Sequence, residues 1–346
     1  MSYSTIDKPT DYFNTKLYAG NSSSGHSITG VGFQPDWTWI KERDASNHHI
    51  LVDAVRGATK YILANDTQAE VTSSNYVSSF NSDGFTVGSD AGVNRGSMVA
   101  WNWKAGTGQG SSNTDGSINT AYTSVNTTAG FSISSYTGTG NVATVGHGLG
   151  VKPDFVIIKE LSNANSWFVY HQSLGATHYL YLNDTDASAA NSNFFQNTEP
   201  TSTLCTIGTD NVVNRSSSSY IMYAFAEVQG FSKMGSYTGN GSTDGTFIYT
   251  GFKPAFVMSK CTSHAGEDWN INDDKRPGYN VIQNALLPNS DAAEVTASFQ
   301  AIDTLSNGFK WRGTNDRVNA SGKSYIYMAF ADSPFVGSNF NPATAR

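Results

Sequence analysis

The sequence carries little charge and almost no cysteine. Only 14% of its 346 residues are charged, against about a quarter in an average soluble domain. The two cysteines, Cys205 and Cys261, fall at non-equivalent places in the chain and are too few for a disulfide framework. We therefore expect a chain made in a reducing cytosol rather than a disulfide-stabilised secreted domain.

Basic clusters and long apolar runs are also missing. The formal net charge is −7, and the densest basic cluster, Lys275-Arg276, directly follows two aspartates. Phosphate binding needs clustered Lys and Arg, so we expect no nucleic-acid partner. No stretch approaches the roughly 20 apolar residues of a membrane helix, so we expect no membrane partner. Residues 1–9 contain no apolar run, and we expect no signal peptide.

What the chain has in abundance is Ser, Thr, Asn, Gly and aromatic residues, whereas good helix formers are scarce. β-Branched and aromatic side chains fit a pleated surface, and Gly, Asn and Asp supply the turns between strands. This composition predicts an all-β fold.

One pattern occurs three times. Each copy has a Pro-led strand, a lysine six residues after that proline, an asparagine roughly sixty residues later, and a closing aromatic strand. The positions are Pro35, Lys41, Asn94 and 97–103; Pro153, Lys159, Asn214 and 219–225; and Pro254, Lys260, Asn319 and 324–330. A period of about a hundred residues fits a small domain better than a solenoid repeat. The sequence thus predicts three copies of one module.

We expect the copies to be tandem β-sandwiches of a jelly-roll or lectin-like kind, because short strands alternate with turn signals every 8 to 12 residues or so. The predicted boundaries are module one with an N-terminal arm at 1–106, a Gly/Ser/Thr-rich linker at 107–128, module two at 129–229, module three at 230–335 with an insertion at 266–288, and a C-terminal tail at 336–346. Almost nothing separates modules two and three, so we expect them to pack as a pair, with module one attached more loosely.

The recurring polar residues have two interpretations each. The three lysines are predicted to be surface charges at strand ends. The three asparagines fit either a turn, in which the side chain bonds nearby backbone, or one ligand contact per module. We favour the turn.

No catalytic motif is present: the sequence has no Gly-x-Ser-x-Gly elbow, no phosphate loop and no cysteine pair at zinc spacing. His48-His49 is an adjacent pair whose side chains would face opposite ways on a strand. We expect no catalytic residue, no cofactor and no metal. Paired carboxylates leave glycoside hydrolysis and a calcium site open, against the favoured interpretation of a plain polar loop; the pairs are Glu267-Asp268, Asp273-Asp274 and Asp184 with Asp186.

The tryptophans divide into two groups. Trp37 and Trp103 align with phenylalanines in the other two copies and are predicted to be core. Trp269 and Trp311 occur only in module three and are expected to be more exposed. With Asp273 and Asp274 they are the candidate ligand-binding residues, and core or interface packing is the alternative for both tryptophans.

Four segments of module one resemble a repeat domain of unknown function found in proteins of tailed bacteriophages, notably marine and cyanobacterial phages. They are Gly-Phe-Gln-Pro-Asp-Trp-Thr-Trp-Ile-Lys at 32–41, Val-Arg-Gly-Ala-Thr-Lys at 55–60, Phe-Asn-Ser-Asp-Gly-Phe-Thr-Val-Gly at 80–88 and Val-Ala-Trp-Asn-Trp-Lys-Ala-Gly at 99–106. The resemblance implies a virion structural protein and brings no catalytic residues with it.

We therefore expect a non-enzymatic phage virion structural protein, made in the host cytoplasm and located in the virion. A tail-fibre or host-attachment role, with binding of host surface glycans, is favoured over a capsid-decorating role. Its expected partners are further copies of itself and other virion proteins. A tailspike-like polysaccharide-degrading enzyme that uses Asp273 and Asp274 is the third alternative.

Overall fold

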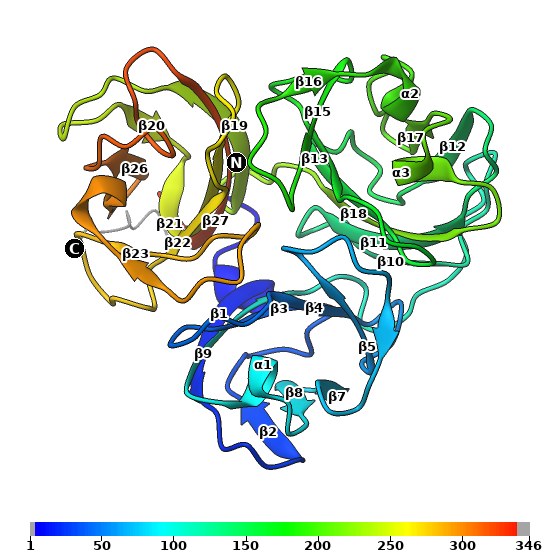
Figure 1. Ribbon diagram of the computed structural model, residues 1–346, viewed down its shortest axis with the longest axis horizontal. Helices are drawn as coiled ribbons and strands as arrows, with labels where there is room; N and C mark the ends of the chain where they lie inside the picture. The colour runs from blue at the N-terminus through cyan, green and yellow to red at the C-terminus, as the bar shows by residue number, and fades with distance from the viewer. Residues whose placement is uncertain (1–3, 338–346) are drawn as a thin grey trace.

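The computed structural model describes residues 4–337 and contains three large antiparallel sheets around a common centre (Figure 1). Sheet one has the order β1 (Phe13–Ala19), β9 (Ser97–Trp103), β3 (Trp37–Glu42), β4 (Ile50–Asp53), β5 (Lys60–Leu63) and β6 (Val71–Thr72). Sheet two has the order β10 (Tyr122–Asn126), β11 (Phe131–Thr137), β18 (Ser219–Phe225), β13 (Phe155–Glu160), β14 (Phe168–His171), β15 (His178–Tyr181) and β16 (Ala189–Ala190). Sheet three has the order β19 (Ser232–Thr238), β27 (Ser324–Pro334), β21 (Phe252–Cys261) and β22 (Asn270–Asp273). The predicted all-β class is confirmed.

Smaller sheets cover the outer side of each large sheet, so that three lobes result (Figure 1). In lobe one the outer sheet is β2 (His26–Thr29), β8 (Gly84–Val87) and β7 (Val77–Asn81), and in lobe two it is β12 (Ala143–Gly146) with β17 (Leu204–Ile207). Lobe three adds β20 (Phe247–Tyr249), β26 (Gly308–Trp311) and β25 (Ile302–Leu305), and the pair β23 (Asn284–Ala285) and β24 (Val295–Thr296). The short helical turns are η1 (Pro9–Asp11), α1 (Ala91–Asn94), α2 (Ser192–Phe195), α3 (Asn211–Asn214) and η2 (Ser298–Gln300). Each lobe is thus layered sheet on sheet, as in a β-sandwich.

Every lobe has its own apolar core between its layers. In lobe one, Ile40 of β3 packs in a cluster with Ile28 and Phe85 of the outer sheet. Cys205 and Ile207 of β17 pack with β13 and β18 in lobe two, and Phe309 and Trp311 of β26 pack with β27 in lobe three. Alternate residues of the inner strands supply these clusters, as the two-residue period of a strand requires.

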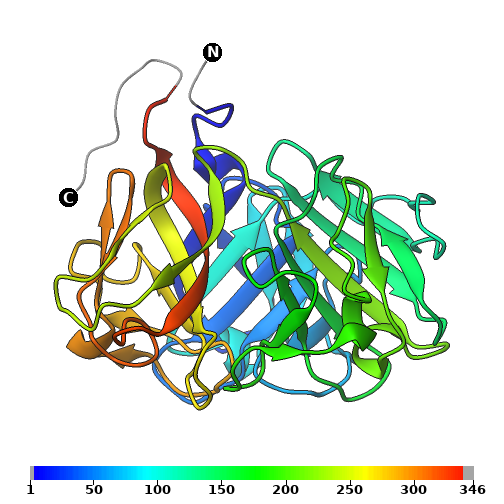
Figure 2. The same ribbon diagram turned by 90° about the horizontal axis from the view of Figure 1, so that it is seen from above.

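The other face of all three large sheets packs into one shared core. Trp103, Phe225 and Phe330 occupy equivalent positions on the closing strands, and their rings meet there, with centroids 6.5 Å (Trp103–Phe225), 5.7 Å (Trp103–Phe330) and 5.9 Å (Phe225–Phe330) apart. The turn η1 also packs against β27 of lobe three (Figure 2). The expected loose attachment of module one is therefore wrong, because its aromatic residues complete a core that the other two lobes share.

The central strands are covered on both sides, as predicted for 219–225. Pro35 and Pro153 precede β3 and β13, which fits a residue that cannot donate a ladder hydrogen bond. Pro254 differs, since it lies inside β21 at a shift in register opposite β27. A bulge is another place where a sheet tolerates proline.

Two predicted segments remain, the linker and the C-terminal tail. The predicted linker at 107–128 contains strand β10, which pairs with β11 as the outermost strand of sheet two. Most of the predicted tail at 336–346 lies outside the described residues. Among residues 4–337, no helix is long and apolar enough to cross a membrane.

Candidate functional site

The three lobes meet through the same pair of backbone hydrogen bonds at each boundary. One bond joins the residue just before β6, β16 or β24 of one lobe to the residue just after the Pro-led strand of another: Glu70 N to Leu161 O (3.0 Å), Ser188 N to Thr262 O (2.9 Å) and Glu294 N to Arg43 O (2.8 Å). The second runs in the other direction: Asn165 N to Thr67 O (2.8 Å), Gly266 N to Thr185 O (3.0 Å) and Asn47 N to Asp291 O (3.0 Å). The boundaries are therefore equivalent in their backbones, and their side chains set them apart.

At the boundary of lobes one and two, a buried ion-pair network is centred on Arg56. Its Nε lies 2.5 Å from Asp53 Oδ2 and its Nη1 lies 3.2 Å from Glu70 Oε2. Lys60 Nζ reaches the other oxygen of Glu70 at 3.3 Å. Asp53 also accepts a hydrogen bond of 2.6 Å from the Tyr223 hydroxyl of lobe two. Burial of such a network is tolerated because every charge is paired and hydrogen-bonded.

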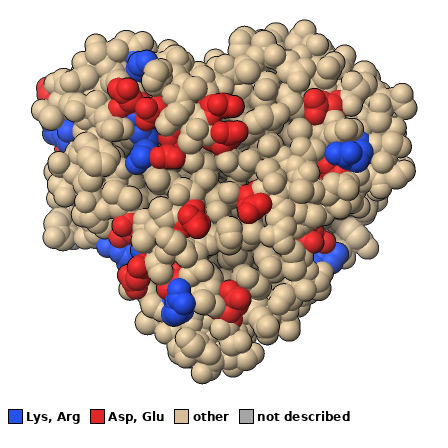
Figure 3. Space-filling model, viewed as in Figure 1, with Lys and Arg blue, Asp and Glu red and all other residues tan. Residues whose placement is uncertain are grey.

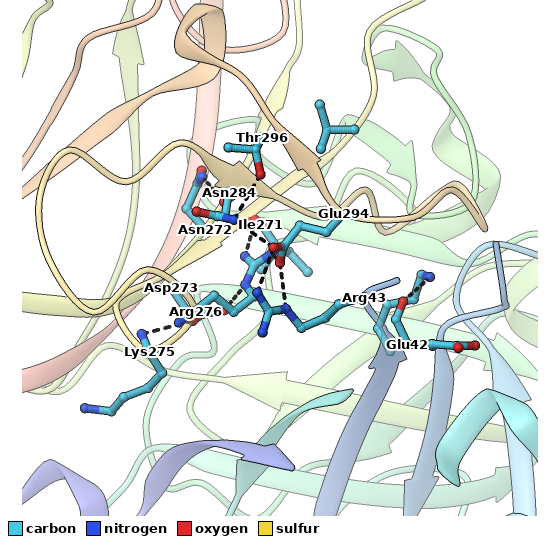
Figure 4. A network of polar contacts seen from close by, with 12 residues as sticks. Glu42, Arg43, Ile271, Asn272, Asp273, Lys275, Arg276, Asn284, Glu294 and Thr296 are labelled. Atoms are coloured by element: carbon cyan, nitrogen blue, oxygen red, sulfur yellow. Dashed lines mark hydrogen bonds and ion pairs between the residues drawn. The ribbon is translucent and has the colours of Figure 1, made fainter. Parts of the chain in front are cut away.

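Lobe three repeats the network at its boundary with lobe one (Figure 4). Arg276 Nε lies 2.6 Å from Asp273 Oδ2, and its Nη1 lies 2.8 Å from Glu294 Oε2. Trp101 of lobe one donates to Asp273 at 3.1 Å, in the way that Tyr223 donates to Asp53. The expectation that 266–288 is an insertion without counterpart is wrong for this part, because Asp273 and Arg276 match Asp53 and Arg56.

Among residues 4–337, no such network forms at the boundary of lobes two and three. His171 and Leu174 stand where the other lobes have aspartate and arginine, and Ser188 stands where they have glutamate. Burial lowers the pKa of His171 to about 4, so its imidazole is neutral at pH 7. The His171 ring lies 3.2 Å from the carbonyl oxygen of Tyr327 in lobe three. This boundary therefore lacks the arginine–carboxylate network of the other two.

The boundary of lobes one and two opens into a groove of about 300 Å³. It is lined by Arg56, Glu70 and Lys60 and by Tyr122, a residue that is 41% exposed. Gln109 lies at the same groove, with its amide donating to Val55 O at 3.0 Å. An open aromatic ring beside fixed donors and acceptors is the usual composition of a small-molecule site. We define these residues as the first groove.

The other two boundaries differ from the first groove in the side chains that line them. An equivalent groove of about 380 Å³ between lobes two and three is lined by hydroxyl groups, including Ser188, Ser263 and Ser324, and carries no acid or base. Between lobes three and one, Arg43 occupies the equivalent space, with Nε and Nη2 bonded to Glu294 at 3.0 and 2.8 Å (Figure 4). Among the described grooves at these boundaries, the first therefore combines charge with an exposed ring.

The four residues predicted to bind ligand are all largely buried. Trp269 and Trp311 are buried, at 1% and 0% exposure. Trp269 donates from Nε1 to Tyr181 O of lobe two at 2.9 Å, and Trp311 packs in the lobe-three core. Asp273 is held in the Arg276 ion pair, and the Asp274 carboxyl is largely buried. Core and interface packing, the stated alternative, accounts for both tryptophans.

Asp274 predicts a pH dependence of stability. Burial raises the pKa of Asp274 to about 7; the carboxylates of Asp332 and Asp273 add to the rise and Lys275 opposes it. Between pH 4 and 7 the folded chain therefore holds a proton that the unfolded chain lacks, and the free energy of unfolding falls as pH rises. We expect Asp274→Asn to remove a fall on the order of 3 kcal/mol between pH 4.5 and 7.5.

Urea denaturation of both proteins at several pH values measures this difference. Buried histidines such as His49 and His171 titrate alike in both proteins, so they cancel in the comparison. Equal pH profiles for the two proteins would show that Asp274 ionises normally.

The recurring lysines and asparagines are structural. Lys41, Lys159 and Lys260 are buried, against the prediction of surface charges, and burial lowers the pKa of each to about 8. Their ammonium groups donate to backbone carbonyls, and two of them reach the neighbouring lobe: Lys159 reaches Thr67 O and Lys260 reaches Thr185 O, each at 3.2 Å.

The asparagines are also fully buried, which leaves no surface for a ligand contact. Each bonds the backbone of two loops; Asn94, for example, donates to Gly88 O at 2.6 Å and accepts from Asn21 N at 2.9 Å. They therefore tie the first hairpin of each lobe to its last loop, in place of the predicted local turn.

Sequence reasoning did not find the residues of the first groove. One signal was available: the equivalent turns read Arg56-Gly57-Ala58-Thr59 and Leu174-Gly175-Ala176-Thr177, so a charge appears at one copy of an otherwise matched position. Tyr122 had no such signal, because it lies in the stretch predicted to be a linker.

The face shown in Figure 3 carries isolated basic and more numerous acidic side chains on a mostly uncharged surface.

The profile of one family, described as a domain of unknown function, DUF7483, matches residues 8–334. The match spans all three lobes and their shared core as a single unit. No curated protein matches the chain.

Proposed function

We propose that this chain, which belongs to the DUF7483 family, is a non-enzymatic structural protein of a tailed-bacteriophage virion that binds host surface glycans. The observation that carries the glycan part is the first groove. The resemblance of residues 32–41 and 99–106 to phage repeat domains supports the virion part. We place the protein at a tail fibre or another host-attachment position, in several copies beside other virion proteins.

The chemistry of the first groove suits a sugar. The open Tyr122 ring offers a flat apolar surface to the C–H face of a pyranose. Lys60 donates hydrogen bonds and Glu70 accepts them, and the buried Arg56 beneath fixes the Glu70 carboxylate before a ligand arrives. Such preorganised donors and acceptors recognise hydroxyl groups without a loss of side-chain freedom. Several copies per virion would turn a weak contact into tight attachment.

Tyr122→Ala is the first test of this function. We expect the variant to bind purified host capsule or lipopolysaccharide about tenfold more weakly than the wild type, a loss of about 1.4 kcal/mol. The matched control is Tyr279→Ala, which removes a ring that is 73% exposed on lobe three. Surface plasmon resonance on the immobilised polysaccharide gives both affinities.

Three outcomes would contradict the proposal. Absence of wild-type binding to any host surface polysaccharide would reject glycan recognition. Loss of binding in Tyr279→Ala but not in Tyr122→Ala would move the site to lobe three. Release of oligosaccharides from the polysaccharide would show that the protein is an enzyme.

A further inference from the structure

We propose that His264, Glu267 and Asp316 bind a divalent transition-metal ion of the zinc class on lobe three. A ring nitrogen of His264 and a carboxylate oxygen from each of Glu267 and Asp316 lie within 4.8 Å of one another. His264 and Glu267 belong to the loop between β21 and β22, and Asp316 belongs to the turn between β26 and β27. This site is remote in sequence from the first groove, and the proposal stands independently of glycan binding.

The observed spacing is close to that of a coordinated ion. Zinc–ligand bonds are about 2.0–2.2 Å long, so ligand atoms on one ion lie roughly 3–4 Å apart. His264 and Asp316 are exposed and Glu267 is half-buried, so rotation of the side chains is free to bring the three atoms together.

Buried side chains form hydrogen bonds to the backbone of two of the three ligand residues. Lys260 Nζ donates to the carbonyl oxygen of Glu267 at 2.9 Å. The Tyr325 hydroxyl donates to the carbonyl oxygen of Asp316 at 2.7 Å. A fixed backbone limits the ordering cost of metal binding to the three side chains.

In lobes one and two, the loop that follows the Pro-led strand has a different role. There the Pro-led strand ends in a buried glutamate: Glu42 pairs with Arg95 at 3.0 Å and Glu160 pairs with Arg215 at 2.9 Å. Loop amides complete these sites, and Asn163, at the position equivalent to His264, donates to Glu160 at 2.6 Å. The loop side chains are thus directed toward the buried acid.

Lobe three has lost that arrangement. Cys261 replaces the glutamate and Ala320 replaces the arginine, so the loop has no buried acid to bond. His264 replaces Asn163, and Asp316 replaces the uncharged Ala91 and Asn211 of the other lobes. The three metal-ligating side chains therefore converge where the ion pair of the other lobes is absent.

The two carboxylates of the site form no ion pair with the described residues, although the Lys260 ammonium exerts a Coulombic attraction on Glu267. Within residues 4–337, no hydrogen bond or ion pair joins the side chains of His264, Glu267 or Asp316 to another group. The nearby Lys260 ammonium donates to carbonyl oxygens, and Arg317 is paired with Asp268 at 2.6 Å. A bound divalent ion would pair directly with both carboxylates.

One imidazole and two carboxylates define the class of ion. Zinc is usually four-coordinate and accepts nitrogen and oxygen ligands. Three ligands from the protein therefore leave one position for water. Calcium instead takes six to eight oxygen ligands, more than this loop offers. We therefore expect preference for zinc, and for cobalt or nickel of similar ligand choice, over calcium.

Isothermal titration of the chelator-treated full chain with zinc chloride tests the site. We expect one zinc ion per chain at micromolar affinity, and a rise in the melting temperature at saturating zinc. His264→Ala and Asp316→Asn are expected to weaken binding at least tenfold and to abolish the rise. His178→Ala removes an exposed histidine of lobe two and is the matched control; it should bind zinc as the wild type does.

The proposal is overturned if wild-type zinc binding is detected only at millimolar concentration, which is adventitious binding. It is also overturned if His264→Ala binds as tightly as the wild type, or if calcium displaces zinc at equal concentration. Circular dichroism of each variant without metal confirms that lost binding is not lost folding. A variant that fails this check is replaced by Glu267→Gln, which keeps the volume of the side chain.

Discussion

Trp103→Ala is expected to lower the free energy of unfolding by about 3–5 kcal/mol and to destabilise all three lobes together. The Trp103 ring lies in the shared core, with centroids 4.5 Å from Trp37, 5.7 Å from Phe256 and 5.7 Å from Phe330. Its removal leaves a cavity that rings from three sheets line. Since the lobes stabilise one another through this core, the loss should appear in one cooperative transition.

Differential scanning calorimetry distinguishes this result from a local effect. Trp103→Phe is the milder variant, because Phe225 and Phe330 fill the equivalent positions in the other lobes; it also removes an indole N–H that has no hydrogen-bond partner among the described residues. We expect it to cost much less than the alanine. Phe247→Ala, on the surface of lobe three, is the control with little effect. Two separate transitions in Trp103→Ala, with only lobe one melting early, would contradict a shared core.

Asp53→Ala is expected to lower the free energy of unfolding by about 3–5 kcal/mol, because it leaves the buried Arg56 charge without its nearest partner. The side chains of Arg56 and Asp53 are 2% and 0% exposed. The variant also removes the acceptor of the Tyr223 hydroxyl from lobe two. Urea denaturation at pH 7 measures the loss, and Asp11→Ala, which breaks the exposed Lys8–Asp11 pair, is the control without measurable effect.

Lobe two shows how this loss can be partly recovered. Leu174 stands there in the place of Arg56, so Arg56→Leu in the Asp53→Ala background removes the unpaired charge and leaves an apolar side chain of a kind that the fold already accepts. We expect the double variant to be more stable than Asp53→Ala alone. If the two losses add, the arginine and the aspartate do not act as a pair.

Much of the fold follows from local pattern. Strand composition predicted the all-β class, and the alignment of Trp37 and Trp103 with phenylalanines correctly predicted core positions. The closing strand at 219–225 has apolar residues on both faces, and this is sufficient to predict a strand buried on both sides.

The relations between lobes could not be predicted in this way. A lysine after a strand has the same local sequence whether it meets water or the backbone carbonyls of a neighbouring lobe, and Lys159 meets Thr67 O. Trp269 was predicted to occur only in module three, which suggested a ligand contact, and this is wrong. It matches Trp167 of lobe two, and each indole donates to a backbone carbonyl of the preceding lobe. The first groove likewise arises from segments far apart in the chain, such as Arg56 and Tyr122.

Cryo-electron microscopy of the purified phage particles tests the central claim, that this chain is a surface component of the virion, most directly. The account predicts three-lobed density of this protein in several copies at a tail fibre or another host-attachment structure, with Tyr122 of the first groove turned outward. Intact infectious particles that lack this density would contradict it, as would density in which neighbouring virion proteins bury the groove.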